Sequence, residues 1–118
     1  MTVSTFRELT TQERELLYRL LEEPFPGQAE IKLQLTHAQV RQIDPDGSLE
    51  FRVSSGPNAT VTDRVPVVAE YDDDDGVPVQ ILLHVVDGKI SELDIWKGDG
   101  SPIRERLKVV GLRIAHAH

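Results

Sequence analysis

The sequence predicts an α+β fold, in which an N-terminal helix packs on a mainly antiparallel β-meander of about five to six strands. A capped segment with leucines at helical spacing comes first, over residues 10–21. From residue 39 onward, apolar and polar residues alternate with the periodicity of strands. Asp-Gly pairs favour tight turns because glycine accepts a positive φ, and four of them divide this region: Asp46-Gly47, Asp75-Gly76, Asp87-Gly88 and Asp99-Gly100.

The first helix is predicted from its cap and its apolar stripe. Thr10 and Glu13 match a capping box, in which the threonine hydroxyl satisfies a backbone amide and the glutamate bonds back to the cap. Pro24 disfavours a helical conformation at the residue before it, so we expect the helix to end there. The apolar stripe consists of Leu16, Leu17, Leu20 and Leu21.

Residues 28–37 allow two interpretations. Apolar residues alternate with polar ones, as in a strand. Glutamine, alanine, glutamate, lysine and leucine, which make up most of the segment, are strong helix formers. We favour a short helix, which places Ile31, Leu35 and Ala38 on one side.

The first three strands are expected at residues 39–44, 48–54 and 64–71. Pro45 favours a type I turn between the first two, because proline suits the second position of that turn. Pro66 has no amide hydrogen to donate to a neighbouring strand. We therefore expect the third strand to lie at an edge of the sheet or to start at a bulge.

The hairpin around Asp87-Gly88 is predicted down to its register. Strand 77–86 has an apolar residue at every second position, and a two-residue loop would place Glu92 and Asp94 on that apolar face. We therefore predict a loop of odd length with Gly88 as a bulge residue. This register gathers four apolar side chains on one face: Ile81, Leu83, Leu93 and Ile95. It gathers four others on the opposite face: His84, Glu92, Asp94 and Trp96.

The segment after Ser101 allows either a short helix that ends at Gly111 or a strand over residues 107–115 interrupted there. We favour the strand because its valines and isoleucine are β-branched. No repeat or linker divides the chain, so residues 1–118 are predicted to form a single α+β domain. With the helix on one face of the sheet, the other face is expected to stay open to solvent or to a partner.

Charge and composition exclude several classes of function. The chain has 20 acidic and 13 basic residues and a net charge of −7, whereas duplex DNA and anionic membranes are bound by clustered basic residues. It has no cysteine, which excludes disulfides, thiolate nucleophiles and zinc ribbons. Neither a secretory signal nor an apolar run near the ~18 residues of a membrane span is present. We expect a soluble, cytoplasmic protein without a cofactor, a nucleic-acid partner or a membrane partner.

Five segments rich in turns and alternating apolar positions carry a resemblance. They are VRQIDPDGSLEF at residues 40–51, RVPV at 64–67, the acidic loop before Gly76, LHVVDGK at 83–89 and ELDIWKGDGSP at 92–102. In these segments the chain resembles a small family of uncharacterised bacterial proteins, known only as a domain of unknown function, over roughly residues 7–103. The resemblance implies a bacterial origin and a single fold unit, and it assigns no catalytic residue.

The most acidic segment is a run of four aspartates: Asp72, Asp73, Asp74 and Asp75. Clustered carboxylates suit Ca²⁺ or Mg²⁺, but the spacing fails the EF-hand pattern, because aligning Gly76 with the loop glycine puts Tyr71 at the first ligand position. We expect a solvated hairpin loop that discourages association of sheet edges, with no metal. His116 and His118 have the spacing of a metal-binding pair on a strand, but chain ends usually fray.

The candidates for binding a ligand or a partner are the polar side chains of the last hairpin: His84, Glu92, Asp94 and Trp96. A histidine beside a carboxylate could act as an acid–base pair, and a tryptophan could stack on a ligand. Opposite charges also pair across strands for stability alone. No motif ties a nucleophile to these residues, so we name no catalytic residue and favour a protein without enzymatic activity.

Three classes of function remain. We favour a non-catalytic, acidic protein-binding module of the accessory or immunity type, whose negative charge steers it towards a basic protein partner. The alternative is a small-ligand-binding protein or an enzyme that uses the sheet face around His84. A metal-binding or purely structural domain is the third class.

Overall fold

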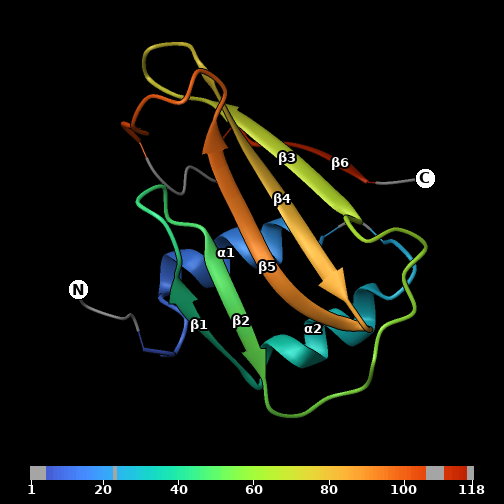
Figure 1. The fold of residues 1–118 in the computed structure, drawn as a ribbon. Coiled ribbons are helices and arrows are strands. Elements are labelled where there is room, and N and C mark those ends of the chain that lie inside the picture. The colour runs from blue at the N-terminus through green and yellow to red at the C-terminus, as the bar shows by residue number, and fades with distance from the viewer. Residues whose placement is uncertain (1–4, 23, 106–110, 117–118) are drawn as a thin grey trace.

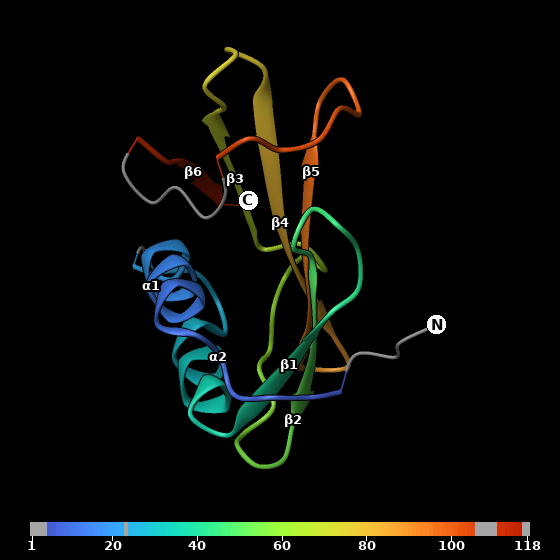
Figure 2. The same ribbon diagram turned by 90° about the vertical axis from the view of Figure 1, so that its left-hand side faces the viewer.

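The computed structural model describes residues 5–22, 24–105 and 111–116 and confirms an α+β fold with a helix at its N-terminal end. A six-stranded antiparallel sheet forms one layer, and two helices form a second layer on one of its faces (Figure 1, Figure 2). The helices are α1 (Thr11–Leu20) and α2 (Gln28–Leu35). The strands are β1 (Ala38–Gln42), β2 (Leu49–Val53), β3 (Val67–Asp72), β4 (Pro78–Val86), β5 (Lys89–Lys97) and β6 (Arg113–His116).

The strands do not follow one another across the sheet in chain order. Their order is β1-β2-β5-β4-β3-β6, and every neighbouring pair is antiparallel. β3, β4 and β5 form a meander, whereas β2 pairs with β5. Residues 54–66 carry the chain from β2 to β3, and Figure 1 shows this segment passing around the end of the sheet where α2 lies.

β3 is not an edge strand, because it lies between β4 and β6. The predicted edge position is therefore wrong. Pro66 precedes the first paired residue, Val67, so its missing amide hydrogen costs no bond of the ladder. β6 confirms the predicted strand from Arg113 onward, while residues 107–110 lie outside the described part of the chain.

A capping box and an arginine hold the start of α1. The Thr10 hydroxyl accepts a hydrogen bond from the Glu13 amide at 3.1 Å, and the Glu13 carboxylate accepts one from the Thr10 amide at 2.9 Å, as predicted. Arg7 donates to both carboxylate oxygens of Glu13, at 2.8 and 3.0 Å. Burial acts to raise the pKa of Glu13, but these hydrogen bonds outweigh it and lower the pKa. The backbone of Arg7 also pairs with Val40, which ties this segment to β1.

α2 confirms the helical interpretation of its segment, and a buried glutamine joins it to the sheet. Gln34 has no exposed surface (0%). Its side-chain nitrogen donates to the carbonyl of Pro57 at 2.7 Å and to that of Gly88 at 2.8 Å. Its side-chain oxygen accepts from the amide of Ile90 at 2.9 Å. One side chain therefore links α2 to the β2–β3 connection and to the β4–β5 hairpin.

The loop of the β4–β5 hairpin has two residues, so the predicted odd loop is wrong. Val86 pairs directly with Lys89. Asp87 and Gly88 both have positive φ, at 52° and 78°, which is typical of a type I′ turn. A Cβ at Gly88 would also lie 2.9 Å from the Cβ of Asn58, so only glycine fits here.

The extra residue lies inside β5, at Ser91. Val85 pairs with Ile90, whereas His84 pairs with Glu92, which leaves Ser91 as a β-bulge. The extra residue places Leu93 and Ile95 on the same face of the sheet as Ile81 and Leu83, as the apolar pattern requires. The predicted apolar face is confirmed, because its four members are all buried: Ile81, Leu83, Leu93 and Ile95.

The core fills the space between the helices and this face of the sheet. The leucine stripe predicted for α1 is buried in full: Leu16, Leu17, Leu20 and Leu21. Residues from the strands complete the core, among them Val40, Leu49, Val67, Ala69 and Val79. Because the core uses the helix-covered face, a binding surface formed by the centre of the sheet must lie on the other face.

Candidate functional site

The four side chains predicted to lie together occupy the face of the sheet that carries no helix. Figure 2 shows both helices on one side of the sheet. On β4 and β5 the buried residues alternate with residues of the other side, and the latter include His84, Glu92, Asp94 and Trp96. We call this side of the sheet the open face, and these four residues the candidate site.

One row of the open face places two carboxylates side by side. In register across four strands lie Arg41 on β1, Glu50 on β2, Glu92 on β5 and His84 on β4. Arg41 forms an ion pair with Glu50. Among the described residues, the Glu92 side chain has no ion pair or hydrogen bond, so two like charges face each other with only one cation beside them.

His84, Glu92 and Asp94 form a compact cluster. One ligand atom of each side chain lies within 4.8 Å of those of the other two. The Nε2 atom of His84 lies 3.7 Å from an Oδ2 of Asp94, which is too long for a hydrogen bond. That nitrogen is shielded from solvent and has no hydrogen-bond partner in the described part of the chain.

Beside this cluster, Trp96 is 44% exposed. It lies opposite Gln80, whose amide donates to Glu70 at 2.7 Å. Arg113 pairs with both Glu70 and Asp72 at 3.0 Å. The acidic residues on the β3 side of Trp96 therefore share one basic partner, whereas those on its own strand have no lysine or arginine partner among the described residues.

The basic residues on the β1 side of the open face are engaged as well. Phe6, from the N-terminal segment, lies under the guanidinium groups of Arg41 and Arg52, at 4.9 and 4.4 Å from its ring centroid. Arg52 also donates to the side chain of Gln39. Glu92 and Asp94 thus remain as carboxylates without a lysine or arginine partner among the described residues, next to an exposed tryptophan. Such an arrangement can bind a cation.

The acidic run lies at the β3–β4 hairpin, and Asp72, Asp74 and Asp75 are exposed, as predicted, whereas Asp73 is buried. Each aspartate has a basic partner: Asp72 with Arg113 at 3.0 Å, Asp73 with Lys97 at 2.9 Å, Asp74 with Arg104 at 3.0 Å and Asp75 with Lys97 at 2.6 Å. Lys97 and Asp73 are only 2% and 3% exposed. The ligand atoms of Asp73, Asp74 and Asp75 lie within 4.8 Å of one another, but the ammonium of Lys97 already pairs with two of these carboxylates.

Asp73 also fastens the chain beyond β5. Its carboxylate accepts hydrogen bonds from the amides of Arg104 at 2.8 Å and Glu105 at 2.9 Å. Burial acts to raise the pKa of Asp73, but these amides and Lys97 lower it far below its ordinary value. The hydroxyl of Tyr71 donates to the carbonyl of Glu105 at 2.6 Å. The acidic run is therefore a structural clamp on this segment.

Two residues that organise the fold, Lys97 and Gln34, are not among those predicted from the sequence. The alternation of β5 does predict that Lys97 is buried, because it follows Leu93 and Ile95 at every second position and so lies on the core side of the strand. No comparable signal marks Gln34, whose partners come from distant segments.

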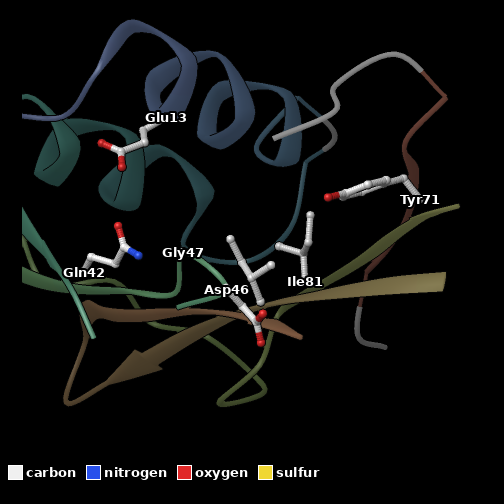
Figure 3. A pocket seen from close by; sticks show the side chains of 7 residues that line it. Glu13, Gln42, Asp46, Gly47, Tyr71 and Ile81 are labelled. Carbon is white, nitrogen blue, oxygen red and sulfur yellow. The ribbon is translucent and has the colours of Figure 1, made fainter. Parts of the chain in front are cut away.

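A cavity between α1 and the sheet does not extend the candidate site. Figure 3 shows Glu13 reaching towards it from α1 and Ile81 from β4. Its volume of about 70 Å³ is far below the ~300–1,000 Å³ of small-molecule sites. Glu13 and the Tyr71 hydroxyl are already bound elsewhere. The full lining is Glu13, Gln42, Asp46, Gly47, Tyr71, Ile81 and Ile95.

No helix among the described residues is long and apolar enough to cross a membrane.

Comparisons with known proteins agree with the resemblance seen in the sequence. No curated protein and no solved structure matches the chain. Residues 6–107, which include both helices, β1–β5 and the candidate site, match the family described as "Domain of unknown function (DUF6984)". The chain therefore belongs to the DUF6984 family.

Proposed function

We propose that this protein is a non-catalytic binding module that engages a basic segment of a protein partner through its open face. The contact is centred on Trp96 and Asp94, with Glu92 two residues further along the same face of β5. The observation that carries the proposal is a half-exposed tryptophan in line, on one face of β5, with two carboxylates that no lysine or arginine of the described residues neutralises.

The chemistry of these side chains suits an arginine or lysine of the partner. The face of an indole attracts a cation, most strongly when water is excluded. Carboxylates accept charge-assisted hydrogen bonds, which are stronger than neutral ones. Tryptophan is also enriched among the residues that dominate protein interfaces. The net charge of −7 would speed the encounter with a basic partner.

The stability lost by placing Glu50 opposite Glu92 supports a role of this face in binding. Like charges directly opposite one another on neighbouring strands destabilise a sheet, as Glu50 and Glu92 do here. A purely structural sheet would gain stability from a neutral or basic residue at position 92. A cationic partner would relieve the repulsion each time it binds.

The positions of the cavities relative to the candidate site support a protein partner over a small ligand. Four cavities lined by described residues have volumes of about 70 to 310 Å³. None of these four is lined by a residue of the candidate site. Small ligands are usually bound in enclosed pockets, whereas protein partners are bound on broader surfaces.

Trp96→Ala is expected to weaken binding of a labelled oligo-arginine peptide by roughly tenfold or more, because truncating a central interface residue costs about 2 kcal/mol or more. Fluorescence anisotropy measures the affinity, and an oligo-glutamate peptide should not bind. Affinity should also fall as salt rises, because exposed charges are screened.

Tyr18→Ala is the matched control, since Tyr18 is an aromatic residue of α1 that is 41% exposed. This variant should bind the peptide as the wild type does. If Trp96→Ala and Tyr18→Ala have equal effects, or if neither has one, the peptide binds elsewhere and the proposed interface is wrong.

A further inference from the structure

We propose that His84, Glu92 and Asp94 form a binding site for a divalent transition-metal ion of the Zn²⁺ type. The ligands would be the Nε2 atom of His84 and one carboxylate oxygen from each acidic residue. The inference goes beyond the proposed protein interface and does not depend on it.

The distances fit such an ion. In a tetrahedral site, two ligand atoms that each lie about 2.1 Å from Zn²⁺ are roughly 3.4 Å apart. The Nε2 atom of His84 and an Oδ2 of Asp94 are 3.7 Å apart, and the ligand atoms of all three residues lie within 4.8 Å of one another. The gap between His84 and Asp94 would close by about 0.3 Å, and the gaps to Glu92 by at most about 1.4 Å, to complete three protein ligands and leave a fourth position open.

The histidine gives a second, independent observation. A buried polar atom without a hydrogen-bond partner is rare and calls for an explanation such as a bound ion. The Nε2 atom of His84 is such an atom in the described part of the chain. A metal ion would satisfy its lone pair, which the carboxylate of Asp94 cannot do at 3.7 Å.

The backbone holds the three ligands in place. β4 and β5 are neighbours near the middle of the six-stranded sheet. The bulge at Ser91 sets Glu92 directly opposite His84 and leaves Asp94 one ladder step away on the same face. Because the ligands lie on paired strands and not on a loop, little conformational entropy is lost when an ion binds.

The donor set defines the class of metal. Imidazole favours zinc and its first-row neighbours, whereas Ca²⁺ and Mg²⁺ prefer oxygen ligands only. Two carboxylates would balance the double charge of the ion. The charge of the ion would also offset the repulsion between Glu50 and Glu92.

Isothermal titration of the full chain with Zn²⁺ tests the site. The titration is done on a His116→Gln/His118→Gln background, which removes the closely spaced pair of histidines outside the proposed site. We expect one ion per chain on this background, with Mg²⁺ giving no comparable binding. His84→Gln and Asp94→Asn should each weaken Zn²⁺ binding by about tenfold or more, since even residues that only orient a ligand are worth about 10–100-fold.

His37→Gln is the matched control, because His37 is exposed and lies outside the cluster. It should leave Zn²⁺ affinity unchanged, and circular dichroism should show that all variants remain folded. The proposal is overturned if Zn²⁺ binding disappears on the His116→Gln/His118→Gln background or survives both His84→Gln and Asp94→Asn. Trp96→Ala should weaken peptide binding and leave Zn²⁺ binding intact, so this site and the proposed interface can fail separately.

Discussion

Replacing Lys97 with methionine is expected to lower the melting temperature by roughly 10 °C or more, because removing one partner of a buried ion pair leaves an uncompensated charge. Methionine keeps the length of the side chain. It removes the ammonium that lies 2.9 Å from Asp73 and 2.6 Å from Asp75. Thermal unfolding followed by circular dichroism measures the effect.

Lys89→Met is the control, since it removes the same charge from an exposed position of the same strand. Surface substitutions usually change stability little, so a shift of about 2 °C or less is expected. Equal losses in Lys89→Met and Lys97→Met would show that the buried cluster contributes nothing of its own.

The pH dependence of unfolding gives a second readout of the same cluster. The pKa of Asp73 is lowered by backbone amides and Lys97, against the effect of burial, and the pKa of Asp75 is lowered chiefly by its hydrogen bond with Lys97. Groups with a lowered pKa stabilise the fold above their ordinary value, 3.8 here, and the contribution is lost as the pH falls below it. The gap between wild type and Lys97→Met should therefore shrink in acid.

Gln34→Leu is expected to reduce the free energy of unfolding by about 2–4 kcal/mol, because two backbone groups, one buried and one partly buried, lose their partner at about 1–3 kcal/mol each. These are the amide of Ile90 and the carbonyl of Pro57. Chemical denaturation measures the loss, and hydrogen exchange should show faster exchange at the Ile90 amide. Gln12→Leu, at an exposed position of α1, should change stability by less than about 0.5 kcal/mol. Similar losses in both variants would show that the hydrogen bonds of Gln34 contribute no stability of their own.

Which side chains of the last hairpin share a face could be predicted from the sequence, whereas the length of its loop could not. Leu83 and Leu93 must both be buried, so they must lie on the same face of the sheet, and the alternation then places the candidate site on the other face. The same alternation requires one extra residue without saying where it lies. The structure places it at Ser91, which lets Asp87-Gly88 form the two-residue turn that this dipeptide prefers.

Long-range pairing explains the other differences. The ion pairs of the acidic run could not be predicted, because the basic partners come from later segments of the chain: Lys97, Arg104 and Arg113. The pairing of β2 with β5 is likewise not local, since the sequence between them contains two further strands. Local patterns predict helices, strands and faces, whereas the order of strands and the partners of buried charges depend on the assembled fold.

Glu92→Gln tests most directly whether the carboxylates of the open face serve binding. It keeps the shape of the side chain and removes the repulsion with Glu50, so it should leave the free energy of unfolding unchanged or raise it by up to about 1 kcal/mol. The same variant should weaken oligo-arginine binding several-fold. Glu15→Gln, at an exposed position of α1, should change neither the stability nor the peptide affinity. A loss of stability in Glu92→Gln together with unchanged peptide affinity would mean that Glu92 has a structural role and that the open face does not recognise a basic partner.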